Sequence, residues 1–154
     1  MLRRSSPHVH TQFCDGQSTA EEMVLSAIAH DFVSLGFSSH ARQDFDLDYA
    51  LDEADERDYL AEIGRLQARY AGDLRIWRGM ERDSLAIAER EPFEYVIASV
   101  HYIACADGSV FPVDGEKEMV KDRVRAFFGG EGIRLAQTYY RILGEYVRTC
   151  KPDI

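Results

Sequence analysis

The chain has 154 residues, a length that fits one ordinary domain. Hydrophobic residues make up 45% of it and charged residues 29%, which is typical of a soluble globular chain. The formal net charge of −9 repels phosphate backbones, so we expect no nucleic-acid partner. A small phosphorylated ligand is still compatible with this charge, because a bound cation can invert the local potential.

Membrane and secretory segments are also not expected. No apolar run approaches the roughly 18 residues that a membrane span needs. The N-terminal Met1–Arg4 has no apolar stretch after its charges, unlike a secretory signal. Three cysteines, Cys14, Cys105 and Cys150, are odd in number and lack Cys-x-x-Cys spacing. These features predict no membrane partner and a reduced, cytoplasmic protein.

The first third of the chain alternates between strand and helix patterns. Residues 7–11 are predicted to form a strand, and the apolar run 33–38 a second one. Between them, Ser18-x-x-Glu21 and Thr19-x-x-Glu22 both fit a capping box. We therefore expect a helix that begins there and ends near His30, which we take as a structural histidine at a helix end.

The middle of the chain begins with a polar, acidic stretch at 42–58, predicted to be a long loop that leads into a helix at 54–70. Helical spacing places four residues of this helix on one buried stripe. They are Tyr59, Ile63, Leu66 and Tyr70. A third strand is predicted at 74–80 and a fourth at 95–100.

The last third is predicted to be helical. One helix should cover 116–128 and end at Gly129 and Gly130, and another should cover 133–147, with Tyr139 and Tyr140 in the core. Strands that are apolar on both faces and alternate with helices predict an α/β fold with a parallel sheet, either open or closed into a barrel.

Metal-competent side chains lie at the predicted strand ends. His10, His40, Glu81 and His101 each fall at or just beyond the C-terminal end of a strand. Parallel α/β folds place their sites at this end. His8 and His10 are two apart, so a strand would point both imidazoles to one face, and Asp15 on the following loop adds a carboxylate. The pattern predicts a metal site.

These motifs resemble the polymerase and histidinol phosphatase (PHP) family, most closely its histidinol-phosphatase branch. The matching stretches follow the family's order and span nearly the whole chain. They are His8–Gly16, Glu21–Val24, Leu35–His40, Gly79–Asp83, Tyr95–Ile103 and Lys151–Ile154. The resemblance implies a distorted, TIM-like barrel of seven βα units, of which this chain looks like about the first four. We therefore expect residues 1–154 to be the N-terminal portion of a single barrel domain, with the C-terminal units and their further ligands absent.

The resemblance also implies a ligand set. His8 and His10 would bind a first metal, and Glu81 would bridge metals. His40, with help from Asp15 or its neighbourhood, would bind a second metal and His101 a third. Such imidazole and carboxylate ligands suit Zn, Mn or Fe. Cys14, near the proposed site, is expected to be a small buried loop residue.

The implied reaction is metal-assisted hydrolysis of a phosphate monoester, namely histidinol phosphate in histidine biosynthesis. Metal ions would supply a hydroxide at neutral pH. Glu81 and His101 would be catalytic, and Arg42 could steer the phosphate.

Two alternatives stay open. One is a PHP phosphoesterase with another sugar or nucleotide phosphate as substrate. The other is a catalytically incomplete fragment that binds metals or only a partner chain. Half a barrel would expose strand edges and apolar faces, which favours self-association.

Overall fold

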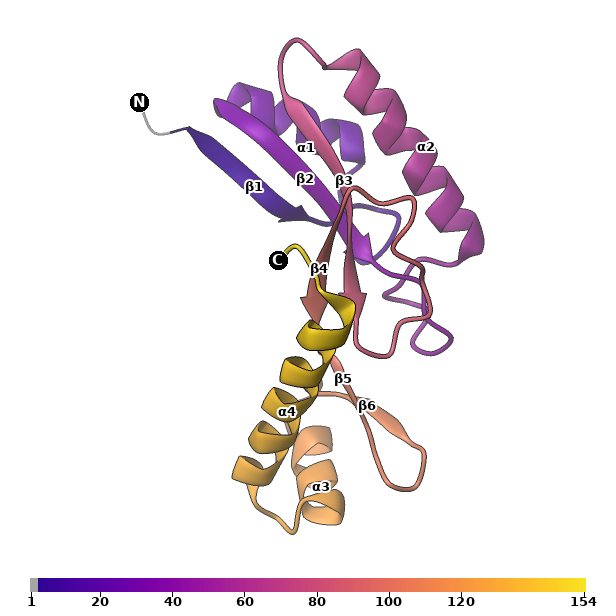
Figure 1. Cartoon of the computed structure of the whole chain (residues 1–154), viewed down its shortest axis with the longest axis vertical. Helices are drawn as coiled ribbons and strands as arrows, with labels where there is room; N and C mark the ends of the chain where they lie inside the picture. The colour runs from indigo at the N-terminus through magenta and orange to yellow at the C-terminus, as the bar shows by residue number, and fades with distance from the viewer. Residues whose placement is uncertain (1–2) are drawn as a thin grey trace. The chain divides into compact units, whose positions relative to one another are not determined.

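The computed structural model describes residues 3–154, and their contacts divide the chain into two compact units (Figure 1). Within the described residues, the first unit comprises 3–82, 86–97 and 153–154, and the second comprises 83–85 and 98–152. The assignment of 1–154 to a single barrel domain stays a prediction. No helix within residues 3–154 combines the length and apolar character needed to cross a membrane.

A four-stranded sheet with the order β1-β2-β3-β4 is the framework on which the predicted ligands lie. The strands are β1 (Arg4–Val9), β2 (Phe32–His40), β3 (Arg75–Asp83) and β4 (Tyr95–Ser99). β1 and β3 both pair with β2 in parallel, and all four arrows point the same way in Figure 1. The predicted α/β class with parallel strands is confirmed.

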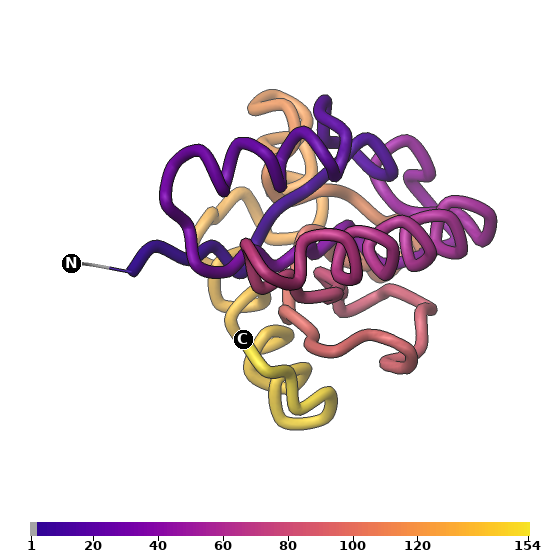
Figure 2. Tube along the Cα trace, turned by 90° about the horizontal axis from the view of Figure 1, so that it is seen from above, coloured from indigo at the N-terminus to yellow at the C-terminus, as the bar shows by residue number. Residues whose placement is uncertain are grey.

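Helix α1 (Ala20–Ala29) begins as one of the two candidate capping boxes predicts. The Thr19 hydroxyl accepts a hydrogen bond from the Glu22 amide, and the Glu22 carboxylate accepts one from the Thr19 amide. The alternative pair is not used, because the Glu21 carboxylate accepts a hydrogen bond from Tyr70 instead. This bond ties α1 to the end of the next helix, and the two helices lie side by side (Figure 2).

Helix α2 (Glu53–Arg69) packs through the stripe that its spacing predicts. Tyr59, Ile63 and Leu66 are fully buried, and Tyr70 is 9% exposed. Burying one such side chain stabilises a fold by about 1.5–3 kcal/mol. The Tyr59 hydroxyl also donates a hydrogen bond of 2.7 Å to the carbonyl of Gly79, which fixes the helix against β3.

The strand ends differ from the predicted ones in a way that matters for the site. β1 ends at Val9, so His10 lies just beyond it, whereas His40 closes β2 and Glu81 lies inside β3. His40 and Glu81 are polar, but both remain in the sheet, where they are paired with each other in the β2–β3 register.

The second unit contains an antiparallel hairpin in a stretch for which the sequence predicts neither a strand nor a helix. Its strands are β5 (Tyr102–Ala104) and β6 (Val110–Pro112). The turn between them places Gly108 at a φ of +84°, a conformation that glycine adopts without a steric penalty. Phe111 of β6 is 1% exposed, and its ring packs edge-on against that of Phe128.

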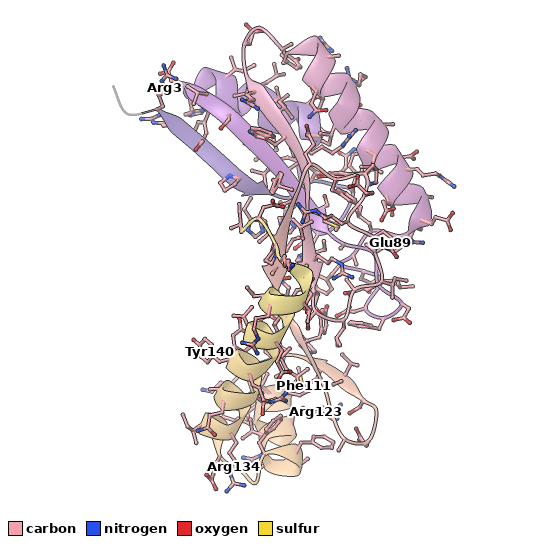
Figure 3. The ribbon with its side chains drawn as sticks, viewed as in Figure 1. Arg3, Glu89, Phe111, Arg123, Arg134 and Tyr140 are labelled. Carbon is pink, nitrogen blue, oxygen red and sulfur yellow. The ribbon has the colours of Figure 1, made fainter. Side chains whose placement is uncertain are left out.

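Two helices complete the second unit: α3 (Lys117–Phe127) and α4 (Gly132–Cys150). Gly129 and Gly130 follow α3 with φ values of +64° and +78°, as their predicted role in ending that helix requires. The expectation that Tyr140 belongs to the core is wrong. Tyr140 is 69% exposed and projects from α4 (Figure 3), because the buried side of this helix is centred on Tyr146.

Candidate metal centre

His8 and His10 come together at the end of the first strand. His8 is the next-to-last residue of β1, and His10 follows the strand. Their rings stack with centroids 4.9 Å apart, and the two Nε2 atoms are 2.8 Å apart. The predicted convergence of these two imidazoles is therefore present.

The loop after His10 folds back and brings Asp15 to the imidazole. The Thr11 carbonyl accepts hydrogen bonds from the amides of Cys14 and Gly16, which closes a tight turn. Asp15 Oδ1 then lies 2.9 Å from His10 Nδ1, and its Oδ2 lies 3.7 Å from His40 Nε2. Asp15 thus lies closer to His10 than to His40.

Sheet register brings His40 to Glu81. The two residues are paired between β2 and β3, and His40 Nδ1 lies 3.3 Å from Glu81 Oε2. The same carboxylate oxygen lies 3.2 Å from Nε2 of His8 and 3.2 Å from Nε2 of His10. Glu81 is 5% exposed, so one buried carboxylate oxygen is shared by three imidazoles.

The first unit therefore contains two overlapping sets of possible ligands. One is His8, His10 and Glu81, and the other is His10, Asp15 and His40. The donor atoms of each set lie within 4.8 Å of one another. Zinc–ligand bonds of about 2.0–2.1 Å in a tetrahedral arrangement separate neighbouring donor atoms by roughly 3.3 Å. In the first set, the 3.2 Å separations of Glu81 Oε2 from His8 Nε2 and His10 Nε2 fit that requirement, whereas the two Nε2 atoms lie closer together, at 2.8 Å. The mixture of imidazole and carboxylate ligands also suits zinc.

The neighbours of His10 strongly affect its protonation. Burial of the ring opposes a positive charge, but hydrogen bonds to Cys14 and Glu81 and the charge of Asp15 outweigh it. Together they raise the pKa of His10 to about 10. In the absence of a cation, this cluster therefore favours the imidazolium form of His10. A bound metal ion could supply the same positive charge.

Asp15 and Cys14 respond to the same positive environment. Burial opposes ionisation of Asp15, but the charges of His40 and His10 keep the pKa of its carboxyl below the usual value. Burial likewise disfavours the Cys14 thiolate, but a hydrogen bond with His10 lowers the pKa of the thiol. Cys14 Sγ lies 3.5 Å from His10 Nδ1, so this residue contacts the cluster directly.

His101 belongs to the second unit and is held there by two carboxylates. Asp83, which is 4% exposed, accepts a hydrogen bond of 2.5 Å from the His101 amide. Asp114 Oδ2 lies 3.4 Å from His101 Nδ1. A carboxylate on one ring nitrogen orients a histidine and leaves the other nitrogen for a ligand. The role of His101 as a ligand stays a prediction.

Arg42 follows β2 but is engaged elsewhere in the first unit. Its Nε lies 3.9 Å from Glu56 Oε2 of α2, and its carbonyl accepts hydrogen bonds from the amides of Ile87 and Ala88. A role in binding substrate stays a prediction for this residue. His30 caps α1 and places its Nδ1 2.8 Å from the carbonyl of Ser26, an arrangement consistent with its predicted structural role.

Several residues near the predicted ligands have no site role in the sequence prediction. Asp83 holds the His101 amide and belongs to the Gly79–Asp83 stretch, but it was not among the predicted ligands. Cys14 lies within the His8–Gly16 stretch but was expected to be only a small buried residue of its loop. Asp114 lies in a Pro-Val-Asp-Gly stretch that signals only a turn. Tyr95 opens an ordinary apolar strand, and its reach across the sheet becomes visible only in the structure.

Comparison with known proteins identifies a family match over most of the chain. A family model for the PHP domain matches residues 6–149. The histidinol-phosphatase of Lactococcus lactis subsp. lactis (strain IL1403) is 30% identical over 132 residues, covering 76% of this chain and 47% of that protein. The histidinol-phosphatase of Bacillus subtilis (strain 168) is 27% identical over 159 aligned positions, covering 91% of this chain and 58% of that protein. The chain thus spans about half the length of these relatives.

Solved structures agree with this match. A Listeria monocytogenes structure described as a histidinol phosphatase superposes with a TM-score of 0.65 at 22% identity, over 77% of this chain and 52% of that one. Histidinol phosphate phosphatase from Lactococcus lactis subsp. lactis Il1403, complexed with Zn, L-histidinol and phosphate, gives a TM-score of 0.55 at 30% identity. That match covers 67% of this chain and 42% of the other.

Proposed function

Because the chain belongs to the PHP domain family, we propose that it functions in the metal-dependent hydrolysis of a phosphate monoester, with histidinol phosphate as the substrate. The observation that carries the proposal is the sharing of one buried Glu81 oxygen by three imidazoles at 3.2–3.3 Å. The named activity of the two relatives supports the substrate. The zinc, histidinol and phosphate in the Lactococcus structure support both substrate and metal.

The ligands that we propose are those of the sequence prediction. His8, His10, His40 and Glu81 would hold divalent ions (Zn, Mn or Fe), with Asp15 beside them. His101 is proposed as a ligand of a third ion and, with Glu81, as a catalytic residue. Bound divalent ions would lower the pKa of a coordinated water and neutralise the phosphate oxygens.

The chain's own residues have distinct tasks in this proposal. Glu81 supplies a buried negative charge that draws cations to the strand ends and fixes three imidazoles around it. Asp15 accepts a hydrogen bond from His10 Nδ1, so that Nε2 of the same ring is the nitrogen left for a metal. Arg42 would assist phosphate binding after release from Glu56.

Release of inorganic phosphate from L-histidinol phosphate, with zinc or manganese supplied, tests the proposal. We expect release that His10→Ala abolishes and His30→Ala leaves intact. If a parent chain loaded with metal releases no phosphate from histidinol phosphate but does so from another sugar or nucleotide phosphate, the substrate assignment is wrong. If no phosphoester is cleaved, the incomplete metal-binding fragment is the correct alternative.

A metal-content measurement separates binding from catalysis. After equilibration with zinc and desalting, His10→Ala and Glu81→Ala should retain at least about 10-fold less zinc than the parent, because each removes a shared ligand. His30→Ala is the matched control, since it removes an imidazole outside the cluster. Equal zinc loss in all three variants would contradict the ligand assignment.

The proposal also includes self-association. β1 is one of the two edge strands of the four-stranded sheet that the described residues form, and such an edge presents unpaired backbone groups to another chain. A molecular mass that rises with concentration in light scattering would support this part of the proposal.

A further inference from the structure

The first strand loses its regular pairing at the point where it carries His8. The β1–β2 register shifts between Ser6 and Val9, so the intervening Pro7 and His8 lie outside the regular ladder. Proline also has no amide hydrogen to donate. The backbone that positions the His8 imidazole therefore needs support from elsewhere.

Tyr95 supplies a contact at this point. It begins β4, the strand at the other side of the sheet from β1. Its hydroxyl donates to the carbonyl of Pro7 at 2.6 Å, with the carbonyl of Phe37 on β2 also within reach at 3.0 Å. A hydroxyl has one proton, and the shorter distance favours Pro7 as its acceptor.

Two glycines make room for this side chain. A Cβ atom at Gly79 of β3 would overlap the Tyr95 ring, and one at Gly36 of β2 would overlap its hydroxyl. The ring therefore lies across the two middle strands, over positions that have no side chain of their own. No residue larger than glycine at either position would leave the Tyr95 hydroxyl where it is.

We propose that Tyr95 is a positioning residue of the metal centre, which holds His8 in place through the Pro7 carbonyl. The inference rests on the proposed function, because it requires His8 to be a metal ligand. Tyr95 itself would contact neither metal nor substrate. Loss of its hydroxyl should weaken metal binding, because the segment 7–8 would no longer be fixed.

A second tyrosine provides a matched control. Tyr59 also donates to a backbone carbonyl of the same sheet, that of Gly79 at 2.7 Å. Gly79 lies in a regular part of the β2–β3 ladder, where it is paired with Ser38. Tyr59→Phe therefore removes the same kind of bond without releasing an irregular segment.

The test is the affinity of the full chain for zinc, measured by competition with a chromophoric chelator, together with the thermal midpoint. Tyr95→Phe should weaken zinc binding about 10-fold, the lower end of the effect of residues that support a ligand. Tyr59→Phe should lower the thermal midpoint but keep zinc affinity within about two-fold of the parent. An equal loss of affinity in both variants would overturn the proposal, because it would indicate a general effect on the fold.

Two further variants separate the possible failures. If His8→Ala weakens zinc binding but Tyr95→Phe does not, the positioning role is wrong and the proposed centre stands. If His8→Ala has no effect, the ligand assignment fails and the positioning role fails with it. Gly36→Ala leaves the Tyr95 hydroxyl in the chain but pushes it out of its present position. It should therefore weaken zinc binding as Tyr95→Phe does. Failure of both Tyr95→Phe and Gly36→Ala to fold would show a purely structural role and overturn the proposal.

Discussion

At the scale of single residues, the centre depends on one tight turn as much as on its ligands. Asp15 reaches His10 because residues 11–16 close on the Thr11 carbonyl. Gly16 ends this turn with almost no free space around its Cα. A Cβ there would lie 2.6 Å from the Thr11 nitrogen and 2.8 Å from the His10 carbonyl carbon, and both are backbone atoms that cannot rotate away.

Gly16→Ala should therefore destabilise the first unit and disturb the metal centre. Overpacking of this kind costs about 1–3 kcal/mol of the free energy of unfolding. The measurement is urea unfolding followed by the fluorescence of Trp77, the single tryptophan of the chain, which lies in β3. Gly72→Ala is the control, because its new Cβ would have no atom of another described residue within 4 Å apart from its chain neighbours. Equal effects of the two substitutions would contradict the steric argument.

The proposed ligands of the site could be predicted from the sequence, but the residue proposed to support them could not. Imidazole and carboxylate side chains at predicted strand ends were sufficient to select His8, His10, Asp15, His40 and Glu81, which the structure brings together. Tyr95 could not be selected. Its contact with Pro7 requires a strand order that puts β1 and β4 on opposite sides of two glycines, and no local pattern encodes that order.

At the scale of elements, the carboxylate of Glu21 joins α1 to α2. Its Oε1 accepts a hydrogen bond from the Tyr70 hydroxyl at 2.7 Å, and its oxygens form ion pairs with Arg65 and Arg69. The hydrogen bonds from Tyr70 and Arg65 hold the pKa of Glu21 below its usual value. A carboxyl whose pKa is lowered on folding stabilises the folded state above its unfolded pKa, and this contribution is lost as the pH falls through the folded pKa.

Glu21→Gln should therefore lower stability near pH 7, and the difference from the parent should shrink below the ordinary glutamate pKa of 4.5. Urea midpoints from Trp77 fluorescence at pH 7 and pH 3 measure this. Glu89→Gln, at an exposed position of the first unit (Figure 3), should have the same urea midpoint as the parent at both pH values. A constant difference between Glu21→Gln and the parent would rule out the carboxylate as the cause.

Elements differ in how well the sequence predicts them. α1 and α2 combine a capping residue with a long apolar stripe, and both were predicted within a few residues of their observed bounds. The hairpin β5–β6 was missed, since strands of three residues carry too little periodicity to recognise. The pair Asp107–Gly108 in its turn was the available signal.

At the scale of the whole molecule, the proposed ligands come from segments far apart in the chain. His8 and His10 lie near the N-terminus, and Glu81 lies about seventy residues later in the same compact unit. The unfolded chain cannot hold these groups together, so a metal that binds them favours the folded state. The pKa of His10 is raised to about 10, so a cation that binds this imidazole would have to displace its proton.

Zinc should therefore raise the stability of the first unit by mass action. At a free zinc concentration 100 times the dissociation constant, the expected gain in unfolding free energy is about 2.7 kcal/mol. The gain should decrease as the pH falls, because protons compete with zinc for the ligand nitrogens. Thermal unfolding followed by Trp77 fluorescence, with zinc or with a chelator, measures the shift. His30→Ala should keep it and His10→Ala should lose most of it. A zinc-dependent shift that survives His10→Ala unchanged would place the stabilising ion outside this cluster.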